Sequence, residues 1–188
     1  ALVIGAETLS KILDWNDRGT CVLFGDGAGA AYLEESDKGI ISVVQGSIGK
    51  KGMVLNCESR RTHNIFTEAG IEHDYLHMDG QEVYKFAVRQ CPKCLLEALE
   101  KADMTADDID YFVLHQANVR IIESVAKRLK APIEKFPMTL GYTGNMSAAS
   151  VPVMLDSLVR DGGLKRGDKV AMSAFGAGLT YGAIVLEW

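Results

Sequence analysis

The chain has 188 residues, of which 47% are hydrophobic and 24% charged, and its formal net charge is -5 at pH 7. This composition is typical of a globular protein, and the negative charge argues against bulk binding of nucleic acid. No apolar run approaches the roughly 20 residues that span a bilayer. The opening ALVIGAETLS is too short for a secretory signal and lacks its basic leading region. Four cysteines do not indicate a disulfide scaffold, so we expect a reducing, cytoplasmic compartment.

Short strands are predicted in the first third of the chain, where apolar runs alternate with glycines. They cover residues 2–4, 20–24, 29–33 and 40–45. The segment 56–77 is polar and irregular, which indicates surface loops. The sequence begins at Ala1 inside an apolar run, without a start methionine or a polar lead-in. We therefore expect a chain that is cut within a fold.

Helices and strands alternate in the rest of the chain. Asp79 is a plausible N-cap, with Glu82 three residues later, and Pro92 should kink the helix that follows. Further elements are a buried strand at 109–115, helices at 118–130 and 147–160, and strands at 169–175 and 180–187. In the helix at 118–130, the residues expected to face inward are Ile121, Ile122, Val125, Ala126 and Leu129. Alternating strands and helices favour a layered α/β fold.

Two glycine-rich segments share one plan. VLFGDGAGAAYLE (22–34) and SAFGAGLTYGAIVLE (173–187) each combine an apolar strand, a Phe-Gly-x-Gly turn, a second apolar strand and a closing Glu. The similarity predicts a duplicated architecture in which each half ends in such a hairpin. Chance resemblance of two glycine-rich hairpins is the alternative. FGDGAG does not match a phosphate loop, because Ala30 stands where a glycine is needed and a strand follows.

Two further patterns suggest metal chemistry only weakly. CPKC at 91–94 is a single pair of cysteines on the buried side of a helix, which favours two small apolar fillers over a metal or redox site. His63, His73 and His77, with Asp74 nearby, have scattered spacing that matches no ligand pattern. We therefore predict no metal site.

His115 stands at the end of a buried strand, where α/β folds generally place their chemistry. A histidine there can also be a satisfied core residue. Asn145 follows a glycine-rich turn in GYTGNMSAAS and precedes a predicted helix, and AFGAG near the C-terminus supplies another turn with accessible N–H groups. An imidazole, a carboxamide and turn N–H groups are the donors that can hold a developing oxyanion.

Four motifs in this order resemble one enzyme family. LFGDGAGA, HQAN followed by RII, GNMSAASVP and AFGAGLTYG look like the C-terminal portion of β-ketoacyl-acyl-carrier-protein synthase III. The resemblance implies a thiolase-like layered αβαβα fold of two similar halves. Residues 1–46 would end the N-terminal half, and 47–188 would form the C-terminal half.

The resemblance also implies catalytic roles. His115 and Asn145 match the histidine and asparagine of a Cys–His–Asn site, whose cysteine lies at the N-terminus of a buried helix upstream of ALVIG. None of Cys21 (mid-strand), Cys57 (loop), Cys91 or Cys94 (helix) has that setting. Phe175 would crowd the malonyl carboxylate, and the Ala177 N–H would serve the acyl-enzyme oxyanion.

Substrate and partner contacts are implied in the same way. Asn118 and Gln81 would contact the CoA or pantetheine arm; simple helix N-capping is the alternative for Asn118. Lys85, Arg120, Lys127 and Arg128 would receive an acidic acyl carrier protein, and a solvated surface is the alternative.

The expected activity is therefore that of an acyltransferase. It would condense an acyl-CoA primer with malonyl-acyl-carrier protein, with loss of CO2, and so initiate fatty acid synthesis as a homodimer without a cofactor. We expect this chain alone to be inactive because the nucleophile is outside it. The alternatives are a ketosynthase of secondary metabolism, a thioesterase-like relative with the same triad, or an inactive fragment that binds the carrier.

Overall fold

The computed structural model describes residues 1–57 and 75–188. The strands of the described part are β1 (Leu2–Glu7), β2 (Gly27–Tyr32), β3 (Ile40–Ser47), β4 (Leu55–Asn56), β5 (His77–Met78), β6 (Tyr111–Leu114), β7 (Lys169–Gly176) and β8 (Thr180–Glu187). Its α-helices are α1 (Gly80–Lys101), α2 (Val119–Leu129), α3 (Leu140–Thr143) and α4 (Ser150–Arg160). Short 3-10 helices are η1 (Leu9–Lys11), η2 (Gly49–Val54), η3 (Ala106–Asp108), η4 (Ile133–Lys135) and η5 (Ser147–Ala149).

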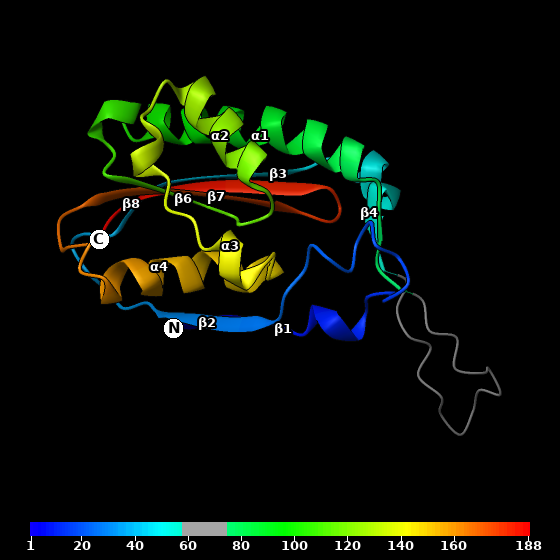
Figure 1. Ribbon diagram of the computed structural model, residues 1–188. Helices are drawn as coiled ribbons and strands as arrows, with labels where there is room; N and C mark the ends of the chain where they lie inside the picture. Colours follow the sequence, from blue (N-terminus) through cyan, green and yellow to red (C-terminus); the bar gives the residue numbers. More distant parts are fainter. Residues whose placement is uncertain (58–74) are drawn as a thin grey trace, which may run out of the picture.

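The elements form layers around one four-stranded sheet. Its order is β3-β8-β7-β6, with β6 parallel to β7 and the other pairs antiparallel. Helices α1 and α2 cover one face, and α3 and α4 lie on the other (Figure 1). Strands β1 and β2 form a separate antiparallel ribbon on the far side of α4. The described part of the molecule therefore has four layers in space: α1 and α2, the four-stranded sheet, α3 and α4, and the two-stranded ribbon.

The main core lies between the four-stranded sheet and the helices α1 and α2. All five residues predicted to face inward on α2 are buried, which is the consequence of apolar side chains at helical spacing. Phe112 of β6 stacks on Phe136 with ring centroids 4.7 Å apart. A smaller cluster under the other face joins α4 to β6 and β7 through Val113, Met154 and Val170.

Helix α1 begins as predicted but continues through its proline. The Asp79 carboxylate accepts hydrogen bonds from the backbone N–H groups of Gln81 and Glu82, so it caps the helix. The Glu82 side chain pairs with Lys51 and Lys85. Pro92 is buried inside α1, which runs on to Lys101.

Glycines allow η5 and α4 to approach the ribbon closely. A Cβ at Gly5 would lie 2.4 Å from the Ala148 carbonyl oxygen, and one at Gly29 would lie 2.9 Å from the Val153 nitrogen. Such distances exclude a side chain unless the backbone moves. The glycines of β1 and β2 therefore allow η5 and α4 to pack in direct contact with the backbone of the ribbon.

The predicted strand at 20–24 is wrong. Residues 20–23 form turns, and Phe24 makes only an isolated parallel bridge to Asn145. The Asp17 side chain accepts hydrogen bonds from the Gly19 N–H and the Thr20 hydroxyl, which stabilises the turn. The first glycine-rich segment is therefore not a hairpin, since β2 pairs with β1, whereas β7 and β8 do form one.

Other predicted boundaries shift modestly. The helix predicted at 147–160 begins as η5 and becomes α4 at Ser150. His77, predicted in a loop, lies in the short strand β5. The division of the chain at residue 46 stays a prediction; β3, at which it falls, pairs with β8 of the four-stranded sheet.

Candidate active site

One pocket of about 290 Å³ brings together most of the residues predicted to carry chemistry. It lies where the C-terminal end of β6, the start of α1 and the loop before α4 meet. Its polar lining includes His115, Asn118 and Asn145, and the end of β7 and the turn that follows contribute Phe175 and Ala177. Apolar lining comes from Leu9, Leu23, Phe24, Leu55, Leu76, Met78, Val83 and Ile121.

His115 is held at the end of β6 by its backbone and its ring. Its backbone N–H donates to the Ser173 carbonyl at 2.8 Å, which continues the pairing of β6 with β7. Its Nδ1 lies 2.6 Å from the Ser150 hydroxyl, and Phe175 packs edge-on with ring centroids 5.3 Å apart. The side chain is 8% exposed, and burial lowers the pKa of the imidazole to about 4. The imidazole is therefore neutral at pH 7.

Asn145 is positioned from the first part of the chain. Its backbone N–H donates to the Leu23 carbonyl, and its carbonyl accepts from the Gly25 N–H, each at 2.9 Å. The side-chain oxygen accepts from the Ser147 N–H at 2.9 Å. Its NH2 group has no hydrogen-bond partner among the described residues and is not buried, so it is available as a donor at the pocket that Asn145 lines.

Gly25 and Gly144 make that backbone contact possible. A Cβ on Gly25 would lie 2.1 Å from the Thr143 carbonyl oxygen, and Gly144 has a φ of +66°. The FGDGAG segment thus serves as a turn, as predicted, and its tip supports the loop that carries Asn145.

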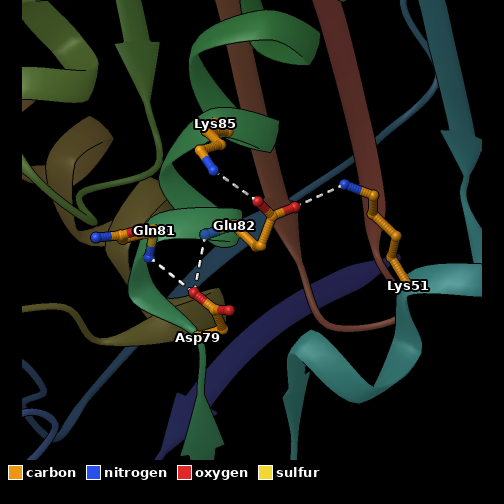
Figure 2. A network of polar contacts seen from close by, with 5 residues as sticks. All are labelled: Lys51, Asp79, Gln81, Glu82 and Lys85. Atoms are coloured by element: carbon orange, nitrogen blue, oxygen red, sulfur yellow. Dashed lines mark hydrogen bonds and ion pairs between the residues drawn. The ribbon is translucent and has the colours of Figure 1, made fainter.

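Asn118 both caps α2 and lines the pocket. Its side-chain oxygen accepts from the Arg120 N–H at 2.8 Å, so the capping alternative is confirmed. Gln81 is exposed in the first turn of α1 and is not among the lining residues. In Figure 2 its side chain points away from Glu82 and the two lysines.

Lys85 belongs to a charged network beside the pocket. Glu82 lies between Lys85 and Lys51, with N–O distances of 2.9 Å to each (Figure 2). The two lysines, Lys85 foremost, lower the pKa of the Glu82 carboxyl to about 2. The three side chains therefore carry one net positive charge at neutral pH.

The other predicted docking residues lie on α2. Arg120, Lys127 and Arg128 are exposed, and α2 packs against α1, which carries Lys85. The structure thus places these four cations on two neighbouring helices.

The four cysteines all lie in the described part. Cys91 and Cys94 are buried in α1, and burial raises their pKa to about 12 and about 11, which makes them unreactive fillers as predicted. Cys21, expected in a strand, lies in a turn. Cys57 is exposed and lines the pocket, which the sequence did not indicate. It follows β4 and is not at a helix N-terminus.

His63, His73 and Asp74 lie outside the described residues. Among residues 1–57 and 75–188, no group of three or more His, Cys, Asp or Glu side chains could hold a metal ion. Within the same ranges, no helix combines the length and apolar character needed to cross a membrane.

Sequence reasoning missed two buried polar residues that hold the site together. Ser150 contacts the ring of His115. The Gln116 amide donates to the Leu114 carbonyl at 2.9 Å, and its oxygen accepts from the Thr139 N–H at 3.0 Å. It thereby ties the end of β6 to the loop that leads to Asn145. The HQAN and SAAS motifs contain both residues, but their partners are distant in sequence.

Comparisons with known proteins identify the family. A family model described as 3-oxoacyl-[acyl-carrier-protein] synthase III matches residues 1–52, and one for the C-terminal part of the same enzyme matches residues 99–188. Together they cover more than half of the chain. The chain belongs to the 3-oxoacyl-[acyl-carrier-protein] synthase III family.

Relatives in the synthase III family are substantially longer than this chain. The β-ketoacyl-[acyl-carrier-protein] synthase III of Clostridium novyi is 50% identical over 190 residues, covering 100% of this chain and 59% of the relative. The crystal structure of the Aquifex aeolicus synthase III is 40% identical with a TM-score of 0.89, covering 100% of this chain and 57% of that one. The predicted thiolase-like α/β fold is confirmed by such neighbours. The chain spans somewhat more than half the length of the relatives it matches.

A polyketide enzyme has a similar structure. The priming β-ketosynthase of the R1128 polyketide biosynthetic pathway is 39% identical with a TM-score of 0.90, covering 100% of this chain and 56% of that one. The synthase III fold thus occurs in proteins with different named roles.

Proposed function

We propose that this chain supplies the His–Asn portion of an acyltransferase site that condenses an acyl-CoA primer with malonyl-acyl-carrier protein. The observation that carries the proposal is the pocket itself. It holds a neutral imidazole and a carboxamide whose NH2 group is free to donate. Membership of the synthase III family supports the reaction class.

The proposed reaction has two stages. An acyl group moves from CoA to a cysteine thiol contributed by polypeptide that lies before the matched region in the longer relatives. A malonyl thioester then loses CO2, and the Asn145 NH2 donates to the enolate oxygen that develops. The enolate carbon attacks the carbonyl of the acyl-cysteine, which forms the new carbon–carbon bond of the 3-ketoacyl product and releases the cysteine sulfur as a thiolate. His115 is the second donor whenever its Nε2 carries a proton. Each such donor contributes about 3–4 kcal/mol to the transition state.

Phe175 and Ala177 complete the proposed site. Phe175 packs between His115 and Phe86, so its ring forms an apolar wall beside the imidazole. Such a wall disfavours a carboxylate and therefore favours its loss as CO2. The Ala177 backbone lies in the turn at the pocket, where its N–H would serve the acyl-enzyme oxyanion. This chemistry needs no metal or prosthetic group.

The proposed partners are acyl-CoA, an acidic acyl carrier protein and a second copy of the complete protein, in the cytoplasm. The exposed cations Arg120, Lys127 and Arg128 on α2, with Lys85 on α1, support the carrier docking surface. Asn118, at the pocket, supports binding of a pantetheine arm, whereas exposed Gln81 can reach only its outer part.

A second candidate is a priming ketosynthase of polyketide biosynthesis. The structural likeness to the R1128 enzyme favours it, since the same pocket would serve both roles. Activity with a fatty-acid acyl carrier protein but not with a polyketide carrier would support the first candidate. The opposite preference would support the second. Carrier binding without decarboxylation would show an inactive binding module.

The intact mass of the purified sample, under denaturing conditions, is the first measurement. A second polypeptide that carries the nucleophilic cysteine would permit assay of both half-reactions. A single 20.4 kDa species should be inactive in condensation under the proposal. Condensation by that species alone would contradict the assignment of the nucleophile.

The Asn145→Ala substitution, in the polypeptide assembly that carries this chain, tests the role of the carboxamide. We expect malonyl decarboxylation to fall by about 100- to 1000-fold, because one oxyanion donor is lost, while acyl transfer from CoA is far less affected. Rates of both half-reactions check this. Asn16→Ala, at an exposed asparagine that does not line the pocket, is the control. Equal losses in the two half-reactions would contradict the proposed role.

A further inference from the structure

Ser150 is a fully buried hydroxyl that contacts the ring of His115. It is the first residue of α4 and has 0% exposure. Its oxygen lies 2.6 Å from His115 Nδ1, 2.7 Å from the Ser147 carbonyl oxygen and 3.4 Å from the Gln116 backbone nitrogen. Three polar groups therefore surround one hydroxyl.

The protons of this cluster can be placed from the chemistry of its members. The Ser147 carbonyl can only accept, and the Gln116 N–H can only donate. A serine hydroxyl has one proton and two lone pairs. If that proton went to His115, two oxygens would face each other at 2.7 Å without a proton between them. The proton therefore goes to Ser147, and Ser150 accepts from both His115 Nδ1–H and the Gln116 N–H.

The other ring nitrogen of His115 is left open. Nε2 has no hydrogen-bond partner among the described residues, and no buried side-chain nitrogen or oxygen in that part of the chain lacks one. Nε2 is therefore accessible, and the space that His115 borders is the pocket. A neutral imidazole with its proton on Nδ1 presents a lone pair at Nε2.

We propose that Ser150 is a positioning residue that holds His115 in the Nδ1–H tautomer, so that Nε2 faces the pocket of the resting protein as a proton acceptor. Ser147 takes part through its backbone carbonyl, which fixes the direction of the Ser150 hydroxyl. The resting pocket then includes an acceptor, His115 Nε2, as well as a donor, the Asn145 NH2.

The presence of an acceptor as well as a donor in the pocket adds detail to the proposed function, and this interpretation rests on that function. If His115 Nε2 carried a proton in the resting protein, both His115 and Asn145 would be donors, and the pair could bind an oxyanion but could not accept a proton. With an open lone pair, His115 can take the proton of a thiol: the S–H bond breaks, an N–H bond forms at Nε2, and the adjacent thiolate offsets the charge that burial disfavours on the imidazolium. The imidazolium then carries a proton on each nitrogen, and Nε2–H can donate beside Asn145.

The test is the tautomer of His115 in the 188-residue chain. Histidine ring nitrogens labelled with 15N give distinct signals when protonated and unprotonated, in long-range 1H–15N correlation spectra at pH 7.5. His115→Gln identifies the signals among the four histidines. The variants are Ser150→Ala, which removes the acceptor, and Ser150→Thr, which keeps a hydroxyl. The experiment needs no substrate, so its outcome is separate from that of the activity assays.

We expect a protonated Nδ1 and an unprotonated Nε2 in the unsubstituted chain. Loss of the Ser150 hydrogen bond should change the tautomer ratio by about five- to thirtyfold toward Nε2–H, and Ser150→Thr should restore the original ratio. A protonated Nε2 in the unsubstituted chain would overturn the proposal, as would an unchanged ratio in a folded Ser150→Ala chain. If Ser150→Ala does not fold, the tautomer of the unsubstituted chain decides alone.

Discussion

At the scale of single residues, burial decides the behaviour of His115. Desolvation alone lowers its pKa, and no charged side chain of the described residues offsets that effect. Its ring is nonetheless fully engaged on one side by Ser150 and Phe175. A neutral imidazole with one anchored and one open nitrogen suits proton exchange, whereas a permanently charged one would not.

The lowered pKa of His115 predicts a pH dependence of stability. Its pKa of about 4 in the folded chain lies below the ordinary value of 6.5, so the unfolded chain takes up this proton first as the pH falls. The stabilisation is present above pH 6.5 and is lost on acidification towards pH 4. We expect His115 to account for about 3 kcal/mol of lost unfolding free energy between pH 7 and pH 4.

Denaturant unfolding of the unsubstituted chain and of His115→Gln, measured at several pH values between 4 and 7.5, checks this expectation. The carboxyl groups titrate in both chains, so the difference between the two curves isolates the histidine. If the unfolding free energies of the two chains differ by the same amount at every pH in this interval, the assignment of a neutral, buried His115 is contradicted.

At the scale of elements, the turn that ends in Phe24 and Gly25 supports the loop that carries Asn145. Asn145 exchanges backbone hydrogen bonds with Leu23 and Gly25, and the added Cβ of an alanine at 25 would meet the Thr143 carbonyl at 2.1 Å. The contact joins segments from opposite ends of the sequence. It depends on backbone atoms, so it tolerates many side chains but not a change of backbone position.

Gly25→Ala should separate the turn from the loop. We expect a loss of about 1–3 kcal/mol in unfolding free energy, which is the usual range for overpacking, together with displaced amide signals around Asn145. Gly141→Ala is the matched control in the same loop region, because its Cβ would meet no atom within 4 Å. Thermal or denaturant unfolding and amide NMR spectra measure both. Equal unfolding free energies and equal amide shifts in the two variants would show that the contact between Gly25 and the Asn145 loop does not position Asn145.

Elements with strong local signals could be predicted from the sequence. Helix α2 has five apolar residues at helical spacing, and β7 and β8 are apolar runs joined by a glycine turn, so local patterns determine them. The strand at 20–24 failed because Val22 and Leu23 are apolar yet exposed, and hydrogen bonds to Asp17 favour a turn. Local hydrogen bonding outweighed an apolar pattern there.

The site could be predicted only in part for a related reason. His115 and Asn145 were identifiable from their positions after a strand and before a helix, and from the family motifs that contain them. The partners that orient them were not, because Ser150, Gln116 and Leu23 act through contacts between distant segments. A periodic pattern shows which face is buried but does not show which two segments meet.

At the scale of the whole molecule, charge is unevenly placed. The chain has a net charge of -5, yet Arg120, Lys127 and Arg128 are exposed on one helix. Lys85, by contrast, has much of its charge balanced by Glu82. If an acidic carrier docks at α2, these helix cations should contribute more to its attraction than Lys85.

Lys127→Glu tests that surface. We expect binding of acyl carrier protein to weaken about two- to tenfold at low salt, mainly through slower association, with a smaller effect at high salt. Lys165→Glu makes the same charge change at an exposed position before β7, away from α2, and is the control. Association rates at two ionic strengths measure the effect. An identical loss for both variants would indicate a general charge effect and would argue against docking at α2.

The backbone bridge between Phe24 and Asn145 has a consequence for how the chain unfolds on heating. The carboxamide is held in place by the part of the chain that contains the two-stranded ribbon β1–β2, whereas the imidazole belongs to the four-stranded sheet. In the described part of the chain, the ribbon packs on one face only, against η5 and α4, so we expect it to open under milder conditions than the main core. On gentle warming, Asn145 should therefore lose its alignment with His115 before the helices melt, while most of the chain is still folded.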